Sequence, residues 1–486
     1  MSARSGSDQR SSNTTSEAET TLWPIRCTDA EVGDFMIPVV TPGEMHEIDF
    51  AAPEATDVLV ERAGAAVART AERMMGGTYG RRVVVLAGPG NNGADGRVAG
   101  RRLAAKGAHV TVFEALTRPP VIPPCELVID AAFGTGFHGV WHAPDVQAPV
   151  LAVDIPSGVD GITGRAGEGA QRADRTVTFA ALKPGLVFPP GSEFAGKVEV
   201  ADIGLDVRSA HAHLVQSSDV ASWLPYRRAD MHKWRSALWI IAGSSGMLGA
   251  AHLAVRGAQR TGAGMIRLSS PGVGADPLAP TEAVRAHLPA SQWSVEALSE
   301  IDRFHAAVVG PGLGRSDGAT ASVREFVAKA PIPLVIDADG LFALAWNDRG
   351  PAAVLASRTE ATVITPHDGE FALLRGGRVS GDRIMEARRL AVDLRVVVLL
   401  KGSTTVVAEP GGEVLLVTAG DERLATAGTG DVLSGIIGAL LAQRVPAFEA
   451  AAAGAWLHGQ AARLGPERGL IAGDIPDCIP DVLARL

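Results

Sequence analysis

The chain has 486 residues, of which 46% are hydrophobic and 20% charged, and this length exceeds what one ordinary core holds. Its net charge of -9 argues against a surface built to bind nucleic acid or an anionic membrane, which needs clustered positive charge. The 3 cysteines are too few for a disulfide framework or a thiolate zinc site, as expected in the reducing cytoplasm. Small molecules are therefore the expected partners.

The N-terminal segment is polar and rich in Ser and Thr. It has no apolar stretch before a small-residue cleavage site, so it is not a secretory signal. We expect residues 1–30 to be a disordered tail. From about residue 41 to 75 the apolar residues are spaced as in amphipathic helices, which we expect to pack on a sheet.

Two α/β series follow. From residue 82 short β-rich runs such as RRVVVLAG and ELVIDAAFG alternate with helical segments, which predicts a mostly parallel sheet. A second series begins near residue 237 with ALWIIAG, and its nearly continuous apolar strands are typical of a sheet covered on both faces. The join is expected at about 216–230. The late apolar run GIIGALLAQRVPAFEAAAAGAWLHG is interrupted by Arg444, Pro446 and Glu449, so it predicts two buried helices rather than a membrane span.

The first series contains the turn GPGNNG at residues 88–93, after a strand and before a helix. This is the form of the dinucleotide fingerprint, and Glu114 stands where an acid would bind a ribose, so an NAD-dependent oxidoreductase is one interpretation. A lone glycine pattern is weak, and Asn91, Asn92 and Asp95 add polar groups at a strand end where α/β sheets bind ligands. In isolation, simple turn formation by Asn and Asp explains the stretch equally well.

Two later strand ends carry similar groups. Asp130 precedes a second glycine turn, and Asp154 and Ser157 lie at a third. Adjacent parallel strands would focus these groups on one crevice, where they could hold a hard cation or the ribose and phosphate of a nucleotide. The stretch GSEFAGK at 191–197 imitates a P-loop, but it follows no strand and lacks the next Ser or Thr, so we reject it.

In the second series the stretch LATAGTGDVLSG, residues 424–435, places a Gly-Thr-Gly-Asp turn at the start of an apolar helix. Peptide N–H groups there would face an incoming phosphate, and Asp431 could orient or deprotonate a hydroxyl. The alternative is an Asp that only caps the helix, which is worth about 1 kcal/mol.

Two further strand ends favour a nucleotide site. Lys401 follows an apolar strand and precedes Gly402 and the hydroxyls at 403–405, an arrangement suited to a phosphate. The stretch ITPHDGEF places His367, Asp368 and Glu370 before a helix, although its acids also complement the helix dipole.

These motifs resemble two known families. The first half is similar to the NAD(P)H-hydrate epimerases through LVERAG, GPGNNGADG, DAAFGTG and DIPSGVDGITG. The second resembles the ADP-dependent NAD(P)H-hydrate dehydratases of the ribokinase-like fold through GSSGMLGAA, VVGPGLG, VIDADGL, TPHDGEF, KGSTT and AGTGDVLSG. The resemblance implies an α/β protein with a Rossmann-like α/β/α three-layer domain at 31–215 and a ribokinase-like α/β domain at 216–486.

The resemblance also implies an activity, the repair of hydrated nicotinamide cofactors. The first half would interconvert the R and S hydrates NADHX and NADPHX, and the second would use ADP to return the S form to NADH or NADPH, releasing AMP and phosphate. ADP would be the phosphoryl donor, potassium would bind in the first half, and magnesium is expected on the nucleotide. No nucleic acid or membrane partner is expected, and a homo-oligomer remains open.

Site residues follow by the same resemblance, with Asp431 and Asp154 as the catalytic carboxylates. The hydrate contacts in the first half would be Asn91, Asn92, Gly93, Ala94, Asp95, Gly134, Thr135, Gly136, Phe137, His138, Gly139, Val140 and Asp154, and the potassium ligands Asn92, Asp130 and Ser157. The hydrate contacts in the second half would be Ala251, Gly314, His367 and Asp431, and the nucleotide contacts Lys401, Gly402, Ser403, Thr404, Thr405 and Gly430.

The sequence departs from the family pattern at a few positions. Ala94 and Trp234 stand where glycine is usual, and Asp421 and Glu422 replace a common Asn-Pro just before the Gly-Thr-Gly-Asp turn. Two rival functions compete with repair. A ribokinase-like small-molecule kinase would share that turn but leave the first half unexplained, and a nucleotide-binding module would bind the same ligands without turnover.

Overall fold

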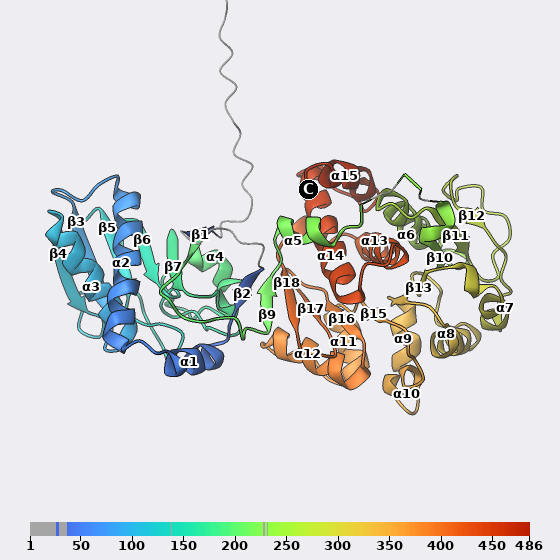
Figure 1. Cartoon of the computed structure of the whole chain (residues 1–486), viewed down its shortest axis with the longest axis horizontal. Coiled ribbons are helices and arrows are strands. Elements are labelled where there is room, and N and C mark those ends of the chain that lie inside the picture. Colours follow the sequence, from blue (N-terminus) through green and yellow to red (C-terminus); the bar gives the residue numbers. More distant parts are fainter. Residues whose placement is uncertain (1–25, 29–35, 138, 227–228, 231) are drawn as a thin grey trace, which may run out of the picture.

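The computed structural model describes residues 26–28, 36–137, 139–226, 229–230 and 232–486, which form two lobes side by side (Figure 1). Most of the expected tail at 1–30 lies outside the described residues. Its segment Arg26–Thr28, however, forms strand β1 at the edge of the first sheet, where it pairs with β8. Each lobe is built around one sheet.

The first lobe contains a 7-stranded sheet in the order β1-β8-β7-β6-β5-β3-β4, and every strand pair in it is parallel. This confirms the predicted parallel sheet. Its other strands are β3 (Arg82–Ala87), β4 (His109–Glu114), β5 (Leu127–Ala131), β6 (Val150–Val153), β7 (Arg175–Phe179) and β8 (Lys197–Ala201).

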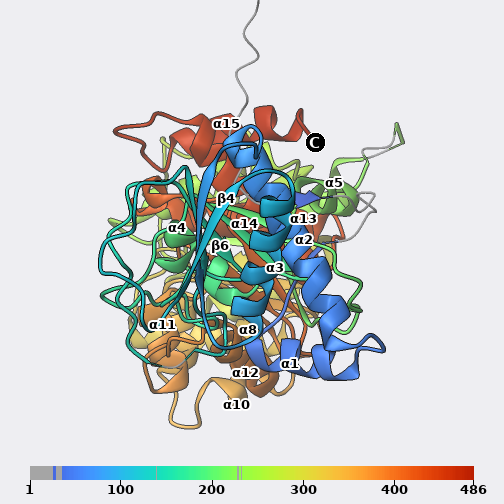
Figure 2. The same cartoon turned by 90° about the vertical axis from the view of Figure 1, so that its left-hand side faces the viewer.

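Helices α2 (Thr56–Met75) and α3 (Asn91–Ala105) cover one face of this sheet (Figure 2). The expected helices form as α1 (Pro42–Ala51) and α2, but only α2 is amphipathic: it buries Ala63, Val67 and Ala71 against the strands, whereas α1 buries Met45 alone. The opposite face is covered by the short helix α4 (Gly191–Ala195), the 3-10 turn η1 (Pro184–Leu186) and long connections.

The second lobe contains an 11-stranded sheet in the order β12-β11-β10-β13-β14-β15-β16-β17-β18-β9-β2. It is parallel from β12 to β16, and β17 then runs antiparallel to both of its neighbours. The strands are β2 (Ile37–Val39), β9 (Ala212–Leu214), β10 (Ala237–Ile241), β11 (Met265–Ser269), β12 (Val284–Arg285), β13 (Ala306–Val309), β14 (Leu334–Ile336), β15 (Thr362–Ile364), β16 (Val397–Leu400), β17 (Thr405–Ala408) and β18 (Val414–Val417).

Helices cover both faces of this sheet, as the continuous apolar strands predicted. Along β10, Trp239 and Ile241 join one core, whereas Leu238 and Ile240 join the other. One layer consists of α5 (Ser217–Trp223), α6 (Leu248–Arg260), α13 (Thr429–Ala442), α14 (Ala447–Leu464) and α15 (Asp474–Leu483); the other contains α7 (Trp293–Ser299), α8 (Asp317–Lys329), α9 (Asp339–Ala345), α10 (Pro351–Leu355), α11 (Asp368–Arg375) and α12 (Arg383–Leu394).

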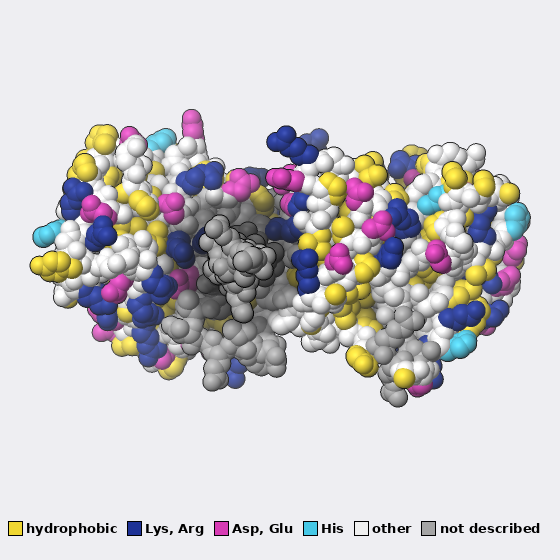
Figure 3. All heavy atoms as spheres, turned by 90° about the horizontal axis from the view of Figure 1, so that it is seen from above, with side chains coloured by type: hydrophobic (Ala, Val, Ile, Leu, Met, Phe, Trp, Pro, Cys, Tyr) yellow, Lys and Arg dark blue, Asp and Glu magenta, His cyan; other side chains and the backbone are white. Residues whose placement is uncertain are grey.

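The late apolar run forms α13 and α14, which confirms two buried helices in place of a membrane span. Within the described ranges, no helix combines the length and apolar character needed to cross a bilayer. On the face seen in Figure 3, acidic and basic side chains are intermixed over both lobes.

Backbone hydrogen bonds and a common core join the two lobes. β9 pairs with β18, and β2 pairs with β9, although both segments lie in the range 31–215 expected for the first domain. Those domain limits remain a prediction. β2 also contacts the first lobe directly: the Leu182 amide donates to the Pro38 carbonyl at 2.9 Å, and the Val40 amide donates to the Leu182 carbonyl at 2.8 Å. One hydrophobic core, containing Leu186 and Leu416 among others, continues from lobe to lobe.

A stability prediction follows from the contact between α13 and α6. A Cβ on Gly435 would lie 1.9 Å from the Ala254 carbonyl oxygen, whereas a Cβ on Gly249 would meet no atom within 4 Å. Gly435→Ala should therefore destabilise the second lobe by about 1–3 kcal/mol through overpacking. Thermal unfolding checks this, with Gly249→Ala as the control; equal midpoints for the two variants would contradict the packing.

Candidate active sites

The first candidate site lies where neighbouring strands β3, β5 and β6 end. A cavity of about 650 Å³ opens there, between the first turn of α3, the loop after β5 and the turn after β6. This is the crevice expected at the carboxyl ends of a parallel sheet. Its lining includes the predicted residues Asn91, Asn92, Asp95, Gly134, Thr135, Gly136, Phe137 and Asp154, and also Met45, His46, Asp49 and Lys183, which the sequence did not single out.

Other predicted hydrate contacts lie elsewhere, and His138 is outside the described residues. Gly93 packs on the strand end, since its Cβ would be 1.9 Å from the Gly88 carbonyl oxygen. Ala94 is helical and faces the groove between α2 and α3, so replacing the usual glycine causes no backbone strain. Gly139 and Val140 are exposed and do not line the cavity.

A buried ion pair stands at one wall of this cavity. The Lys183 ammonium lies 2.8 Å from Asp154 Oδ1 and also donates to the Thr178 hydroxyl at 2.9 Å. Lys183 is 1% exposed, and burial of a charge requires such a partner. Asp154 has a φ of 66°, an unusual conformation for a residue other than glycine and one that often marks a functional position. The available sequence signal was one lysine within the apolar run AALKPGL.

Asp95 is poised to carry a proton. Burial, the largest cause, together with the negative charges of Asp154 and Asp49, raises the pKa of Asp95 to about 8. The carboxyl group is therefore mostly protonated at neutral pH. A cavity that holds one protonated acid beside a lysine-paired carboxylate can supply and accept protons.

Of the three residues predicted to hold potassium, Asp130 and Ser157 are hydrogen-bonded to each other, and Asn92 lines the cavity. Ser157 donates from its amide and its hydroxyl to the two oxygens of Asp130, at 2.9 and 2.7 Å. Burial raises the pKa of Asp130. Both polar atoms of the Asn92 amide are buried and have no hydrogen-bond partner in the part of the chain that the structure describes. Gly134 lies between Asn92 and Asp154, since a Cβ there would be 3.5 Å from Asn92 Cγ and 3.3 Å from Asp154 Oδ2.

Glu114, the acid of the dinucleotide fingerprint, is already engaged. Arg97 forms an ion pair with it at 2.6 Å and donates to the Gly88 carbonyl at 3.0 Å. Glu114 does not line the cavity. The arrangement therefore does not favour the Rossmann type of ribose binding.

The raised pKa of Asp95 gives a test by stability. The folded state binds this proton more tightly than the unfolded chain, whose pKa is 3.8, so the contribution of Asp95 is fully present below pH 3.8 and is lost as the pH rises through about 8. Asp95→Asn should match the parent chain near pH 4. At pH 8 the melting temperature of Asp95→Asn should exceed that of the parent chain by at least ~2–4 °C. A stabilisation of about 1 kcal/mol produces a shift of that size.

Thermal scans from pH 4 to pH 8 measure this difference. The exposed Glu168, changed to Gln, is the matched control and should show no such trend. If the difference in melting temperature between Asp95→Asn and the parent chain stays constant over this pH range, the raised pKa of Asp95 is ruled out.

The second candidate site lies at the start of α13, beside the ends of β14 and β16. Gly428 is the N-cap of α13 with a φ of 92°, and Thr429, Gly430 and Asp431 form the first turn. Asp431 is thus inside the helix and makes no side-chain cap, which leaves its carboxylate available for chemistry. A Cβ on Gly430 would be 3.5 Å from Lys401 Nζ, so the absence of a side chain lets the lysine approach the turn.

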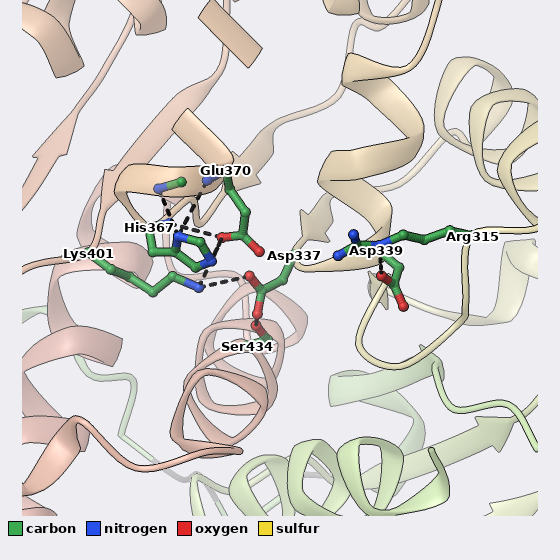
Figure 4. A network of polar contacts seen from close by, with 8 residues as sticks. Arg315, Asp337, Asp339, His367, Glu370, Lys401 and Ser434 are labelled. Carbon is green, nitrogen blue, oxygen red and sulfur yellow. Dashed lines mark hydrogen bonds and ion pairs between the residues drawn. The ribbon is translucent and has the colours of Figure 1, made fainter. Parts of the chain in front are cut away.

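A polar network surrounds this turn (Figure 4). The Lys401 ammonium lies 3.0 Å from Asp337 Oδ1 and 3.7 Å from Glu370 Oε2. Ser434 donates its hydroxyl to Asp337 Oδ2 at 2.6 Å. Burial alone would lower the pKa of Lys401, but the charges of Asp337 and Glu370 outweigh burial and raise the pKa, so the lysine stays cationic.

Asp431 titrates near neutrality. Burial is the largest cause that raises the pKa of Asp431 to about 7, and Asp337 adds to it, while Lys401 opposes the shift. A carboxylate that exchanges its proton near pH 7 is suited to general acid–base work.

The other predicted residues of this lobe are placed in different ways. His367 caps α11, with Nδ1 accepting from the Gly369 amide at 2.9 Å, and Gly314 donates its amide to Asp339 Oδ2 at 2.9 Å. Ala251 is buried in the first turn of α6. Gly402 and Ser403 are exposed after β16, and Thr405 is half-buried.

Thr404 faces the first lobe. It is 2% exposed, and its hydroxyl donates to the Val187 carbonyl at 2.8 Å. Its side chain therefore joins the lobes, and only its backbone adjoins the predicted nucleotide contacts.

Sequence reasoning missed Asp337 and Ser434 as site residues, although VIDADG was visible as a polar strand end. It also missed Arg383, which donates to the Lys401 carbonyl at 2.7 Å. The negative charge of Asp421, which stands where the family pattern has an uncharged residue, is neutralised by an ion pair with Arg423 at 2.6 Å. Trp234 lies before β10, at the opposite end of that strand from the site, and contacts Phe304.

Comparison with known proteins agrees with both halves. A family model described as NAD(P)H-hydrate dehydratase matches residues 238–483, and one described as YjeF-related protein N-terminus matches 56–123 and 114–185. The bifunctional NAD(P)H-hydrate repair enzyme Nnr of Moorella thermoacetica is 36% identical, over 92% of this chain and 97% of its own length. The chain belongs to the bifunctional NAD(P)H-hydrate repair enzyme family.

Solved structures resemble the second lobe. A ribokinase-like superfamily protein from Enterococcus faecalis has a TM-score of 0.50 at 21% identity, covering 58% of this chain and 98% of its own. This likeness shows the ribokinase-like fold. The ADP/ATP-dependent NAD(P)H-hydrate dehydratase of Bacillus subtilis, co-crystallized with ATP/Mg2+, is 32% identical over 55% of this chain and 95% of its own, with a TM-score of 0.47.

Proposed function

We propose that this member of the repair-enzyme family restores hydrated nicotinamide cofactors at two separate sites. The first lobe epimerises NADHX and NADPHX, and the second dehydrates the S form with ADP. The observation that carries the proposal is that each lobe brings a lysine–aspartate ion pair with one buried partner, and a second, protonatable aspartate, to the carboxyl edge of its sheet. Family membership supports the same pairing of activities.

In the first site, epimerisation inverts the carbon that bears the hydroxyl beside the ring nitrogen. Protonated Asp95 gives its proton to that hydroxyl, which leaves as water while the nitrogen lone pair forms a C=N bond. Water then adds to the opposite face and passes a proton to Asp154, which Lys183 holds in place. Because the reaction runs both ways, the two carboxyl groups exchange roles in the reverse direction.

Potassium fits the first lobe on chemical grounds. The oxygens of Asn92, Asp130 and Ser157 would hold the ion. The buried Asn92 amide has no hydrogen-bond partner among the described residues, and a bound ion would satisfy its oxygen. When bound, the ion supplies positive charge beside the glycine loop that carries Gly134. The surrounding turn residues would then contact the hydrate.

In the second site, the hydrate's C6 hydroxyl attacks the terminal phosphorus of ADP, its proton passes to Asp431, and the bond to AMP breaks. Phosphate is a better leaving group than hydroxide. As it departs from C6, the ring nitrogen donates electrons, and the C5 proton then passes to the released phosphate, which restores the C5–C6 double bond. Lys401 and the amides at the start of α13 stabilise the phosphoryl charge.

The remaining assignments belong to this proposal. Ala251, Gly314 and His367 would contact the hydrate, and Gly402, Ser403, Thr405, Gly430 and the backbone of Thr404 would contact the nucleotide, with magnesium on its phosphates. The expected location is the cytoplasm, in keeping with only 3 cysteines in the chain.

Separate loss of the two activities tests the proposal. Asp431→Asn should lower dehydration by about 100-fold or more, the usual cost of losing a general base, and leave epimerisation intact. Dehydration is followed by the absorbance of reduced nicotinamide after adding S-hydrate and ADP, and epimerisation by chromatography of the two hydrates.

Asp154→Asn is the reciprocal variant and should retain dehydration of the S form while losing epimerisation. Loss of both activities in either variant would refute two independent sites. A parent chain that binds ADP and hydrate without turnover would instead favour a binding module, and ADP-dependent phosphorylation of an unrelated alcohol with no repair would favour a kinase.

A further inference from the structure

Asp337 connects the two halves of the second site. It follows β14 directly, is 2% exposed, and uses both carboxylate oxygens. Oδ1 lies 3.0 Å from the Lys401 ammonium, and Oδ2 accepts the Ser434 hydroxyl at 2.6 Å. Figure 4 shows Lys401 and Ser434 approaching this carboxylate from different elements.

Ser434 carries the connection to the reacting turn. It lies on α13, and its hydroxyl also contacts the Gly430 carbonyl at 3.1 Å, one helical turn earlier. A Cβ on Gly430 would lie 3.5 Å from Lys401 Nζ and 3.8 Å from Asp337 Oδ2. The strand end, the lysine and the first turn of α13 therefore meet around one carboxylate.

We propose that Asp337 is a positioning residue for dehydration: its carboxylate fixes Lys401 against the first turn of α13 and sets the charge that surrounds Asp431. This inference rests on the function proposed for the second lobe. Asp337 needs no contact with the hydrate or with ADP to act in this way.

The charges that face Asp431 come from several elements. Asp337 follows β14, Asp339 begins α9, Glu370 lies on α11, and Lys401 follows β16; of these, only Lys401 is cationic. Because Asp337 and Glu370 compensate the lysine, Asp431 meets little net positive charge. The raised pKa of Asp431, caused first by burial and next by Asp337, is consistent with this arrangement.

A purely structural role is the competing explanation. Asp337 and Lys401 could be paired simply because each charge requires the other. Removing Asp337 would then lower the stability of the protein without altering the protonation of a neighbour. The two explanations differ in the pH dependence of dehydration, because only the proposed role changes the field at Asp431.

Asp337→Asn in the full chain is the test, and Ser434→Ala is its matched control. The Asn variant keeps the shape but removes the negative charge and leaves Lys401 compensated by Glu370 at 3.7 Å without Asp337, so both changes favour ionised Asp431. The acid limb of the dehydration rate should move to lower pH by about one unit, with kcat reduced about tenfold or more. Ser434→Ala breaks a hydrogen bond to the same carboxylate without changing charge, and its limb should stay in place.

The outcomes are distinct. A shifted limb in Asp337→Asn but not in Ser434→Ala supports the proposal, whereas a lower rate with an unmoved limb in both overturns it. If Asp337→Asn turns over too slowly, the pH dependence of ADP binding is the second readout, since ionised Asp431 repels the phosphates, and the fall in affinity should begin about one unit lower. Epimerisation by the same sample checks folding, and failure of the parent chain to dehydrate would refute the proposed function instead.

Discussion

Parallel strand pairing is the constraint on which both sites depend. In a parallel sheet each strand must be followed by a crossover, so all strands end at the same edge. Asp95, Asp130 and Asp154 are far apart along the chain, yet β3, β5 and β6 are neighbours, and the turns after them meet at one cavity. The same geometry brings the residues after β14 and β16 to the first turn of α13.

The two lobes have different folds but contain the same electrostatic arrangement. In each, a lysine forms an ion pair with an aspartate: buried Lys183 pairs with half-buried Asp154, and half-buried Lys401 pairs with buried Asp337. A further aspartate stands close by without a lysine of its own, and burial raises its pKa to about 8 in the first lobe and to about 7 in the second. Because each lysine is paired, its charge does not outweigh desolvation, which is the largest cause of the raised pKa of the remaining acid in both lobes.

The sequence allowed most of the fold to be predicted, because apolar runs and glycine turns are local signals. The small strands β2 and β9 carry little such signal, and their place in the second sheet depends on distant partners. The sequence singled out polar residues at strand ends, such as Asp154, and at a helix start, such as Asp431, and their roles in the sites stay predictions. It did not single out Lys183 or Asp337, since their contacts depend on a partner from another strand, and Thr404 shows that a side chain inside a motif can point to the other lobe.

The segment that carries Lys183 is held on both sides by the second lobe. Leu182 is bonded to the stretch around β2, and Val187 accepts from Thr404. β2 and β9 precede α5 in the chain but belong to the second sheet, in which β9 pairs with β18 and β2 pairs with β9. A protease cut just after α5 would therefore leave two fragments that remain associated through backbone pairing and a shared core. Electrophoresis in denaturant would then show two fragments, whereas size-exclusion chromatography would show one particle.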